Sequence, residues 1–323
     1  MLEVELDIFS GMPNPTWRLS AKEEKELLDR IMAEPDQLSP VVAPDENFGL
    51  GYRGLIIRQI KTDAGPWSSA KRPSGLKFPT GIAVRRSALP DHFRVGSKTA
   101  KQASAADWLL QTSERKDSHV TDLLREVVRE GVSLIPGDRA AVQPSAGDTK
   151  AAKGKGGADE QIGVEGAQWW ACSSAYYSAN AATFNDPAHV TRNNCYCFAS
   201  NHLADVRYAL PGRRGGHPAT SITCSGVIAG LRADGWVDGC QTNTLTIVLV
   251  IWPNVDYHFY RVVTGGPAWW WGHKPGGTPA KYTDDSGRAI NLQNGLSPYN
   301  CNRGRYTDFC GYFYQNNSTA FVA

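Results

Sequence analysis

The sequence predicts an α+β protein of two domains joined by a linker. A length of 323 residues is about twice that of a typical domain. The segment 137–167 is rich in Ala, Gly and charged residues and has no aromatic residue, a composition that cannot bury enough apolar surface to fold by itself. All seven cysteines lie after it, between Cys172 and Cys310. We therefore expect a small α+β recognition or regulatory domain over 1–136, a flexible linker over 137–167, and a second domain over 168–323.

The first domain is predicted to combine a sheet with helices. In LEVELDIF, apolar residues alternate with acidic ones, which indicates a half-buried strand. Ser20 is followed three residues later by Glu23, the pattern of a capping box, so a helix is expected over 21–34. His92 and His119 are isolated surface histidines, and no catalytic cluster is evident, so the domain is expected to recognise, inhibit or tether a partner. Further strands are expected over 51–60 and 81–89, and further helices over 103–112 and 119–131.

The second domain is predicted to begin with helices and to continue as an antiparallel sheet. One helix covers 195–209 and is stopped by Pro211-Gly212, and a second covers 225–236. Val, Ile and aromatic residues are dense in the segments that follow, as is typical of strands. These strands are expected over 244–252, 256–263, 268–275 and 305–314.

Composition and charge exclude several classes of function. A net charge of +2 predicts no binding to nucleic acid, and no apolar run approaches the roughly 20 residues of a membrane helix. The N-terminus, MLEVELDIF, lacks the basic and apolar regions of a signal peptide, so we expect a cytoplasmic protein or one exported by a signal-less route. An odd number of cysteines leaves at least one thiol over, and free or mixed thiols are expected without a secretion signal. No cofactor is expected.

Two cysteines at the start of the helix predicted over 195–209 raise the question of a nucleophile. Asn194 is a favoured N-cap residue, which places Cys195 at the first helical position. The unpaired N–H groups and the helix dipole there favour a thiolate. Cys197 lies about 200° further round the helix and cannot share that environment. Cys195 is therefore the predicted reactive thiol, and the alternatives are a buried inert cysteine or a disulfide partner.

Two histidines are predicted to face each other across a hairpin. His258 and His273 lie in consecutive expected strands, with the turn signal Gly265-Gly266-Pro267 between them. A hairpin centred on Gly265-Gly266 places the histidines directly opposite on one face, where Cβ atoms are roughly 4.5–5.5 Å apart. A one-residue slip at Pro267 would send His273 to the other face. A thiolate, a histidine base and a polar group that orients this base form the machinery of a cysteine hydrolase.

The residues around Cys195 resemble the nucleophile motif of a known group. A cysteine that opens a helix, followed at the third and fourth positions by an aromatic residue and an alanine (C-x-x-F-A), is similar to the motif of CHAP-type amidases. Those belong with the NlpC/P60 hydrolases in the papain-like fold, and the resemblance covers 169–315. It implies a helix packed on an antiparallel sheet, Cys195 as nucleophile, His258 as base and His273 as the residue that orients it. It also implies an amide substrate in a peptide, a protein or peptidoglycan, as for a peptidase, an antibacterial effector or a phage-type lysin.

Two other functions remain open. Both cysteines and both histidines are of types that bind zinc, although C-x-C is a poorer spacing than C-x₂-C and no second close pair exists; no metal is expected. The runs WW (169–170), AYY (175–177) and WWW (269–271) favour a non-enzymatic module that stacks on sugars or peptides. The predicted substrate-binding residues of a cleft wall are Trp269, Trp271 and Tyr260. The other histidines of this domain, expected to be structural or surface residues, are His189, His202 and His217.

Overall fold

The computed structural model describes residues 1–42, 49–60, 90–97, 103–114, 118–133, 180–239, 243–264 and 270–323. The chain divides into two compact units. Unit 1 contains Met1–Ile8, Asn14–Glu46 and Tyr52–Ser145, and unit 2 contains Phe9–Pro13, Asn47–Gly51 and Ala146–Ala323. Two short segments of the range 1–136 thus belong to unit 2. The predicted linker over 137–167 and the predicted strand over 81–89 lie outside the described residues.

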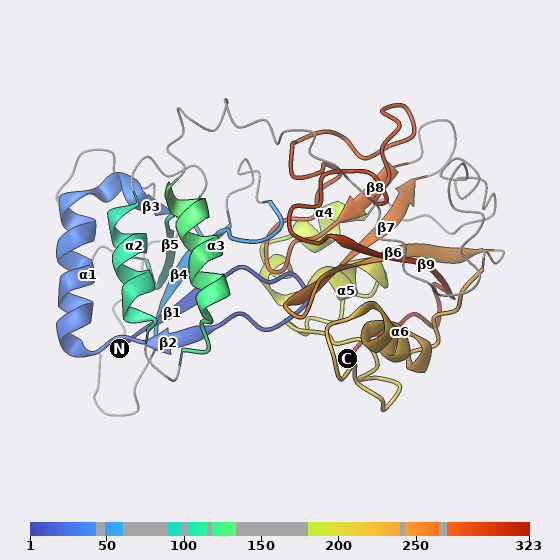
Figure 1. Ribbon diagram of the computed structural model, residues 1–323, viewed down its shortest axis with the longest axis horizontal. Helices are drawn as coiled ribbons and strands as arrows, with labels where there is room; N and C mark the ends of the chain where they lie inside the picture. Colours follow the sequence, from blue (N-terminus) through green and yellow to red (C-terminus); the bar gives the residue numbers. More distant parts are fainter. Residues whose placement is uncertain are drawn as a thin grey trace. The chain divides into compact units, whose positions relative to one another are not determined.

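Within the described residues, unit 1 is an antiparallel sheet accompanied by helices. The sheet has five strands in the order β2-β1-β4-β5-β3: β1 (Leu2–Asp7), β2 (Thr16–Arg18), β3 (Leu38–Ser39), β4 (Gly54–Gln59) and β5 (His92–Val95). Helices α1 (Ala21–Ala33), α2 (Ser104–Thr112) and α3 (Asp122–Ser133) lie side by side (Figure 1), and a short 3-10 helix covers Pro35–Gln37. The three helices and strands β1 and β4 agree with the prediction. Strands β2, β3 and β5 are too short to give a clear alternation in the sequence.

Helix α1 begins at the predicted capping box. The Ser20 hydroxyl accepts the backbone N–H of Glu23, and the Glu23 carboxylate accepts the Ser20 N–H at 2.7 Å. Leu27 and Ile31, one turn apart, are fully buried in the core of unit 1. Burial of each such side chain contributes about 1.5–3 kcal/mol, which fixes the face that the helix turns inward.

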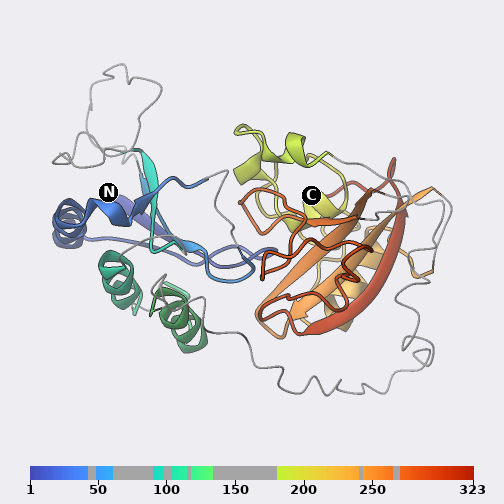
Figure 2. The same ribbon diagram turned by 90° about the horizontal axis from the view of Figure 1, so that it is seen from above.

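The described part of unit 2 contains a four-stranded antiparallel sheet in the order β8-β7-β6-β9, with the strands side by side in Figure 2. The strands are β6 (Thr244–Trp252), β7 (Asp256–Thr264), β8 (Trp270–His273) and β9 (Asp308–Asn316). All four were predicted from their dense Val, Ile and aromatic residues. The helices are α4 (Ala181–Asn185), a 3-10 helix over Val190–Arg192, α5 (Cys195–Ala199) and α6 (Cys224–Ala233). The protein is thus of the mixed α+β class, with antiparallel sheets.

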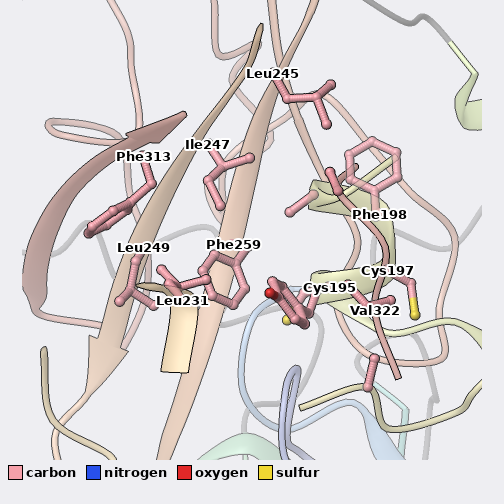
Figure 3. Close-up of a cluster of buried hydrophobic side chains, with 14 of the residues drawn as sticks. Cys195, Cys197, Phe198, Leu231, Leu245, Ile247, Leu249, Phe259, Phe313 and Val322 are labelled. Atoms are coloured by element: carbon pink, nitrogen blue, oxygen red, sulfur yellow. The ribbon is translucent and has the colours of Figure 1, made fainter. Parts of the chain in front are cut away.

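The two faces of this sheet have different partners, because alternate residues of a strand point to opposite faces. On one face Phe259 belongs to a buried cluster that includes Phe198 of α5 and Leu231 of α6 (Figure 3). On the other face the ring of His258 lies 5.7 Å from that of Tyr306, which belongs to the long segment between β8 and β9. The sheet is therefore covered on both sides.

The predicted helix over 195–209 is much shorter in the structure. Helix α5 ends at Ala199, and Asn201 and Asp205 have the left-handed backbone angles φ 52° and 53°, which a continuing helix cannot contain. The Asn193 side chain holds this turn, because its Nδ2 donates to the Asp205 carboxylate at 2.9 Å and its Oδ1 accepts the Asp205 N–H at 3.0 Å. No helix in the described residues is long and apolar enough to cross a membrane.

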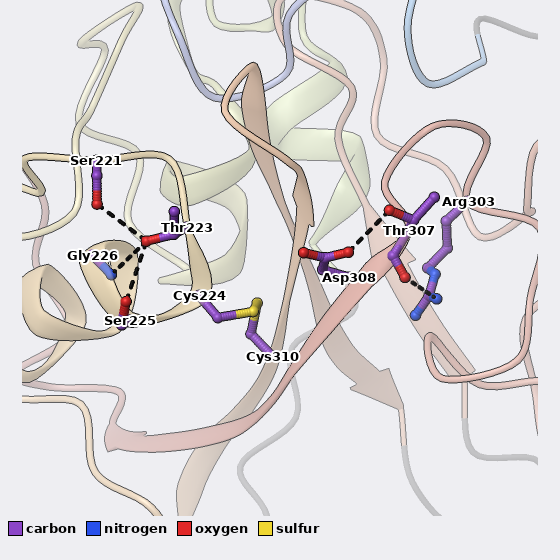
Figure 4. The surroundings of a disulfide bond; sticks show 9 residues. All are labelled: Ser221, Thr223, Cys224, Ser225, Gly226, Arg303, Thr307, Asp308 and Cys310. Atoms are coloured by element: carbon purple, nitrogen blue, oxygen red, sulfur yellow. Dashed lines mark hydrogen bonds between the residues drawn. A yellow bond between two sulfur atoms is a disulfide. The ribbon is translucent and has the colours of Figure 1, made fainter. Parts of the chain in front are cut away.

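A disulfide joins α6 to β9 in unit 2. It connects Cys224 with Cys310, whose Cα atoms are 5.3 Å apart (Figure 4). The hydroxyl of Thr223 caps α6 next to this bond by accepting the N–H of Gly226 at 3.2 Å. Among the described residues, the cysteines that remain as thiols are Cys195, Cys197 and Cys301. Unit 2 therefore contains both a disulfide and free thiols.

Candidate functional site

The two histidines predicted to interact meet on the face of the sheet opposite α5. Strand β8 pairs with β7 through His273 and Tyr260, and the register shifts between Val262 and Thr264. The predicted register is therefore wrong: His273 lies opposite Tyr260 rather than His258, because the pairing is irregular between Val262 and Thr264. A displacement of two residues preserves the face, so the predicted contact still forms. Nε2 of His258 and Nδ1 of His273 are 2.8 Å apart.

Both histidines are fully buried, and His273 is held on several sides. Burial lowers the pKa of His273 well below its usual value of 6.5, and the charge of Lys281 lowers it further. The ring of Tyr260 stacks on His273 with a centroid distance of 4.7 Å. His273 is therefore neutral at pH 7 and confined to one orientation.

The hydrogen bonds of this pair determine where its protons lie. Nε2 of His273 is 2.9 Å from the carbonyl oxygen of Thr283, which can only accept, so Nε2 carries the proton of the neutral ring. The unprotonated Nδ1 of His273 then accepts a hydrogen bond from Nε2–H of His258. Neutral His258 is consequently unprotonated at Nδ1, and this atom is its basic nitrogen.

Cys195 lies where α5 packs against β7. Its Sγ is 3.9 Å from the carbonyl oxygen of Tyr257. As predicted, Asn194 caps the helix, and its Oδ1 accepts the backbone N–H of Cys197 at 3.2 Å. The side chain of Cys195 is fully buried beneath its neighbours.

The predicted stabilisation of a Cys195 thiolate is wrong for this conformation. Burial raises the pKa of Cys195 well above its usual value, and the charge of Asp256 raises it further. The N–H of Phe259 and the ammonium group of Lys274 oppose this increase but do not outweigh it. Because α5 ends at Ala199, few peptide dipoles align behind the thiol. The resting thiol is therefore protonated.

The side chains of Cys195 and His258 lie on opposite faces of β7. The sulfur approaches Tyr257 O and Phe259 N, which flank His258 in the chain. The His258 ring leaves the strand on the opposite face, toward its histidine partner. The structure therefore brings His258 and His273 together, and it places the Cys195 thiol beside the main chain of His258.

The aromatic residues predicted to line a cleft are buried. Tyr260 is 0% exposed and Trp271 is 3% exposed, whereas Trp269 lies outside the described residues. The ring of Trp271 lies 6.1 Å from that of Tyr312 on the same face of the sheet. Tyr260 therefore packs on the histidine pair and Trp271 on Tyr312, and neither ring is open to a sugar or peptide in this conformation.

The described residues contain no group of three or more His, Cys, Asp or Glu side chains placed to hold a metal ion. The zinc alternative requires the two cysteines and the two histidines to converge on one point. Here Cys195 belongs to the cluster around α5, while His258 and His273 bond to each other on the opposite face of β7. The four side chains are therefore not arranged as ligands of one ion.

The other histidines of unit 2 have structural or surface roles. Nδ1 of His189 lies 2.9 Å from the carboxylate of Asp205, and Nδ1 of His202 accepts the N–H of Val322 at 3.1 Å. His217 is exposed. These surroundings agree with the prediction.

Sequence analysis does not single out Lys274, which follows His273 and is fully buried. Its Nζ donates to the carbonyl oxygens of Val190 and Gly276 at 2.6 and 2.8 Å. The charge of Lys274 acts to lower the pKa of Cys195. A lysine within a segment rich in Gly and Pro gives no pattern from which burial could be inferred.

A second residue missed by sequence analysis is Asp256, at the first position of β7. It is fully buried, and the hydroxyl of Tyr306 donates to its Oδ2 at 2.5 Å. Backbone N–H groups of the segment Ser10–Met12 also donate to this carboxylate. The only signal in the sequence was the turn SGMPNP, which indicates a change of chain direction but not its partner.

Comparison with known proteins identifies a relative of this chain. No family model matches the chain, and no solved structure matches it. The chain is similar to insoluble matrix shell protein 1 of Ruditapes philippinarum, with 36% identity over 149 residues. The matched region makes up 44% of this chain and 89% of the relative. The chain therefore belongs to the family of this shell matrix protein.

Proposed function

We propose that unit 2 is a cysteine-dependent amide hydrolase of the papain-like type. Cys195 is the nucleophile, His258 the base and His273 the residue that orients the base. The chain of hydrogen bonds from Thr283 O through His273 to His258 carries this proposal, because it makes Nδ1 of His258 the basic nitrogen. The order of elements, a helix opened by cysteine before an antiparallel sheet that carries both histidines, supports the resemblance to CHAP and NlpC/P60 hydrolases.

In the proposed reaction, Nδ1 of His258 removes the proton of Cys195 Sγ as the sulfur attacks the carbonyl carbon of an amide. The C–N bond breaks, and the amine leaves with the proton returned by His258, so that the acyl group remains on Cys195 as a thioester. Water then attacks the thioester while His258 takes its proton. The C–S bond breaks, His258 returns this proton to the sulfur, and the carboxylic acid is released. His273 keeps His258 in the required tautomer throughout.

The resting conformation must change locally before this reaction. Because the thiol is protonated and buried, proton removal must accompany attack rather than precede it. The His258 ring must also approach the sulfur, which lies 3.9 Å from the carbonyl oxygen of Tyr257 in the same strand. Because the two side chains lie on opposite faces of β7, this approach requires a rearrangement of strand β7 itself and not only of a loop.

The proposed substrates are amide bonds in peptides, proteins or peptidoglycan, which the resemblance implies. The comparison favours a second candidate function: a structural component of a matrix, because the relative is an insoluble matrix shell protein. The disulfide between Cys224 and Cys310 is compatible with this role, since such bonds persist in oxidising surroundings. In that case the histidine pair is part of the core and there is no turnover.

An assay of amide cleavage by the full chain distinguishes the two candidates. Peptides and purified peptidoglycan serve as substrates, and new amino groups are measured. We expect cleavage by the wild type, none by Cys195→Ser, and a loss of about 10²–10⁴-fold in His258→Ala. Cys197→Ser is the matched control, because this thiol lies in the same helix and has no role in the proposed reaction. Turnover that survives Cys195→Ser contradicts the assignment of the nucleophile. A folded wild-type protein that cleaves neither substrate favours the matrix role.

A further inference from the structure

The segment Ser10–Met12 is held through its main chain by residues 194–306 of the same unit. The N–H groups of Ser10, Gly11 and Met12 donate to the carboxylate of Asp256, at 2.5, 3.2 and 2.9 Å. Successive N–H groups that converge on one anion form a compact anion-binding arrangement of the backbone. The carboxylate of Asp256 therefore binds three consecutive backbone N–H groups of the segment and none of its side chains.

The carbonyl group of Gly11 is bound at the same place. Its oxygen accepts Nδ2–H of Asn194 at 3.2 Å and the hydroxyl of Tyr257 at 3.1 Å. The hydroxyl of Tyr306 lies 3.2 Å from Ser10 Oγ and also donates to Asp256. Donors and acceptors of unit 2 thus match the N–H and C=O groups of a short peptide.

Glycine is required at the centre of this peptide. A Cβ atom placed on Gly11 would lie 2.3 Å from Cε2 of Tyr257, closer than real contacts allow. The Tyr257 ring is buried against Phe259, with a centroid distance of 5.6 Å, so it cannot move aside easily. The arrangement discriminates glycine from any residue with a side chain.

The need of Asp256 for N–H donors explains why main chain occupies this position. Burial raises the pKa of Asp256 to about 6, and the hydrogen bonds from Tyr306 and from the backbone N–H groups of Ser10 and Met12 oppose this effect. A buried carboxylate without such donors is costly. A ligand that replaces the segment must therefore bring several N–H groups of its own.

We propose that Asn194, Asp256 and Tyr257 form a binding site for a glycine-centred peptide main chain, occupied in this structure by the protein's own Ser10–Gly11–Met12. Asn194 precedes Cys195, and Tyr257 O contacts its sulfur. The segment is thus bonded to Asn194 and Tyr257, which adjoin the fully buried thiol of Cys195, and its release is expected to expose this thiol. This inference goes beyond the proposed hydrolysis, and its test measures binding and thiol accessibility rather than turnover.

The first experiment displaces the segment in the full chain. Gly11→Ala introduces the Cβ that collides with the Tyr257 ring, so alkylation of Cys195 by iodoacetamide should become at least about tenfold faster, equivalent to roughly 1.4 kcal/mol. Cys301, a buried thiol outside the site, should react at its wild-type rate. Asp256→Asn, which weakens the acceptor without adding volume, should act in the same direction, and the pH dependence of alkylation separates this from the effect of the lost charge on the pKa of Cys195. Unchanged Cys195 reactivity in both variants overturns the proposal, as does an equal increase at Cys195 and Cys301.

The second experiment refills the vacated site. The capped hexapeptide FSGMPN, which has the sequence of residues 9–14, is added to Gly11→Ala protein and binding is followed by fluorescence anisotropy. It should bind and restore the slow alkylation of Cys195. The matched peptide FSAMPN should do neither. Equal binding of both peptides, or binding of neither, overturns the assignment of a glycine-selective site, whether or not the protein cleaves amides.

Discussion

His273 pairs with Tyr260 across β7 and β8, yet its Nδ1 lies 2.8 Å from Nε2 of His258. The two imidazoles are thus diagonal neighbours rather than direct cross-strand partners, a distance that long side chains can span. Tyr260 occupies the direct position and stacks on His273, and Thr283 O binds the far nitrogen. His273 therefore presents one acceptor atom in one direction to His258.

Replacement of His273 tests whether it orients His258. His273→Gln keeps an acceptor for Nε2–H of His258, whereas His273→Ala removes it. We expect His273→Ala to reduce turnover less than His258→Ala does, and His273→Gln to reduce it less again. Nitrogen NMR of labelled histidine gives a readout that does not need turnover. Nδ1 of His258 should be unprotonated in the wild type and in His273→Gln, and an unchanged tautomer in His273→Ala would contradict the orienting role.

Burial of neutral His273 should make unit 2 sensitive to mild acid. The pKa of His273 is well below 6.5 in the folded protein, so the unfolded chain binds a proton below about pH 6.5 while the folded chain does not. The free energy of unfolding should fall with decreasing pH from there, by up to about 1.4 kcal/mol for each pH unit. His273→Gln should flatten this decline between pH 7 and pH 5. The same substitution at exposed His217 is the control and should leave the decline unchanged.

Local signals in the sequence predicted many of the elements. Strand β6 has the predicted bounds. Its nine residues are all buried and are mostly apolar or β-branched, so the composition of the segment alone favours a strand. The capping box of Ser20 and Glu23 is likewise local. Helix α5 was predicted too long because its end depends on contacts of Asn193 with Asp205, twelve residues away in the chain. Such contacts leave no periodic pattern.

The part of the site that could be predicted is the part that depends only on the alternation of side chains between the two faces of a strand. The shared face of His258 and His273 survives any even displacement of register, so their contact was predicted although the register was wrong. The state of the Cys195 thiol depends on burial and on the charge of Asp256, which tertiary packing brings near it. The segment Ser10–Met12 that donates to Asp256 lies more than two hundred residues away from it in the sequence, as the separation of 246 shows.

Loss of the Cys224–Cys310 disulfide should destabilise unit 2. The bond ties the start of α6 to β9 across 86 residues of sequence, so its removal gives the unfolded chain more freedom and costs about 2–5 kcal/mol. The double variant Cys224→Ser, Cys310→Ser should show faster hydrogen exchange of the β6 amides at neutral pH. Strand β1 of unit 1 provides the internal control. Unchanged exchange in β6 would contradict a stabilising role for the bond.

Asp7 forms buried ion pairs in unit 1. Its carboxylate lies 2.7 Å from Nη2 of Arg53 and 2.8 Å from Nη1 of Arg94. Burial alone would raise the pKa of Asp7, but the two guanidinium charges outweigh it and hold the pKa well below its usual range. The stability that this carboxylate contributes is therefore present above the unfolded pKa of about 3.9 and is lost as the pH falls below it.

Asp7→Asn preserves the shape of the side chain but removes the charge between the two arginines. Removal of one partner from a buried ion pair typically costs about 3–5 kcal/mol, because the remaining charge stays desolvated. We expect hydrogen exchange of the β1 and β4 amides to accelerate at pH 7, and the difference from the wild type to shrink as the pH falls below about 3.9. Asp29→Asn is the matched control, since the Lys25–Asp29 pair is exposed by 79% and 47% and contributes little. Equal acceleration in the two variants would contradict the view that burial decides the strength of the Asp7 pairs.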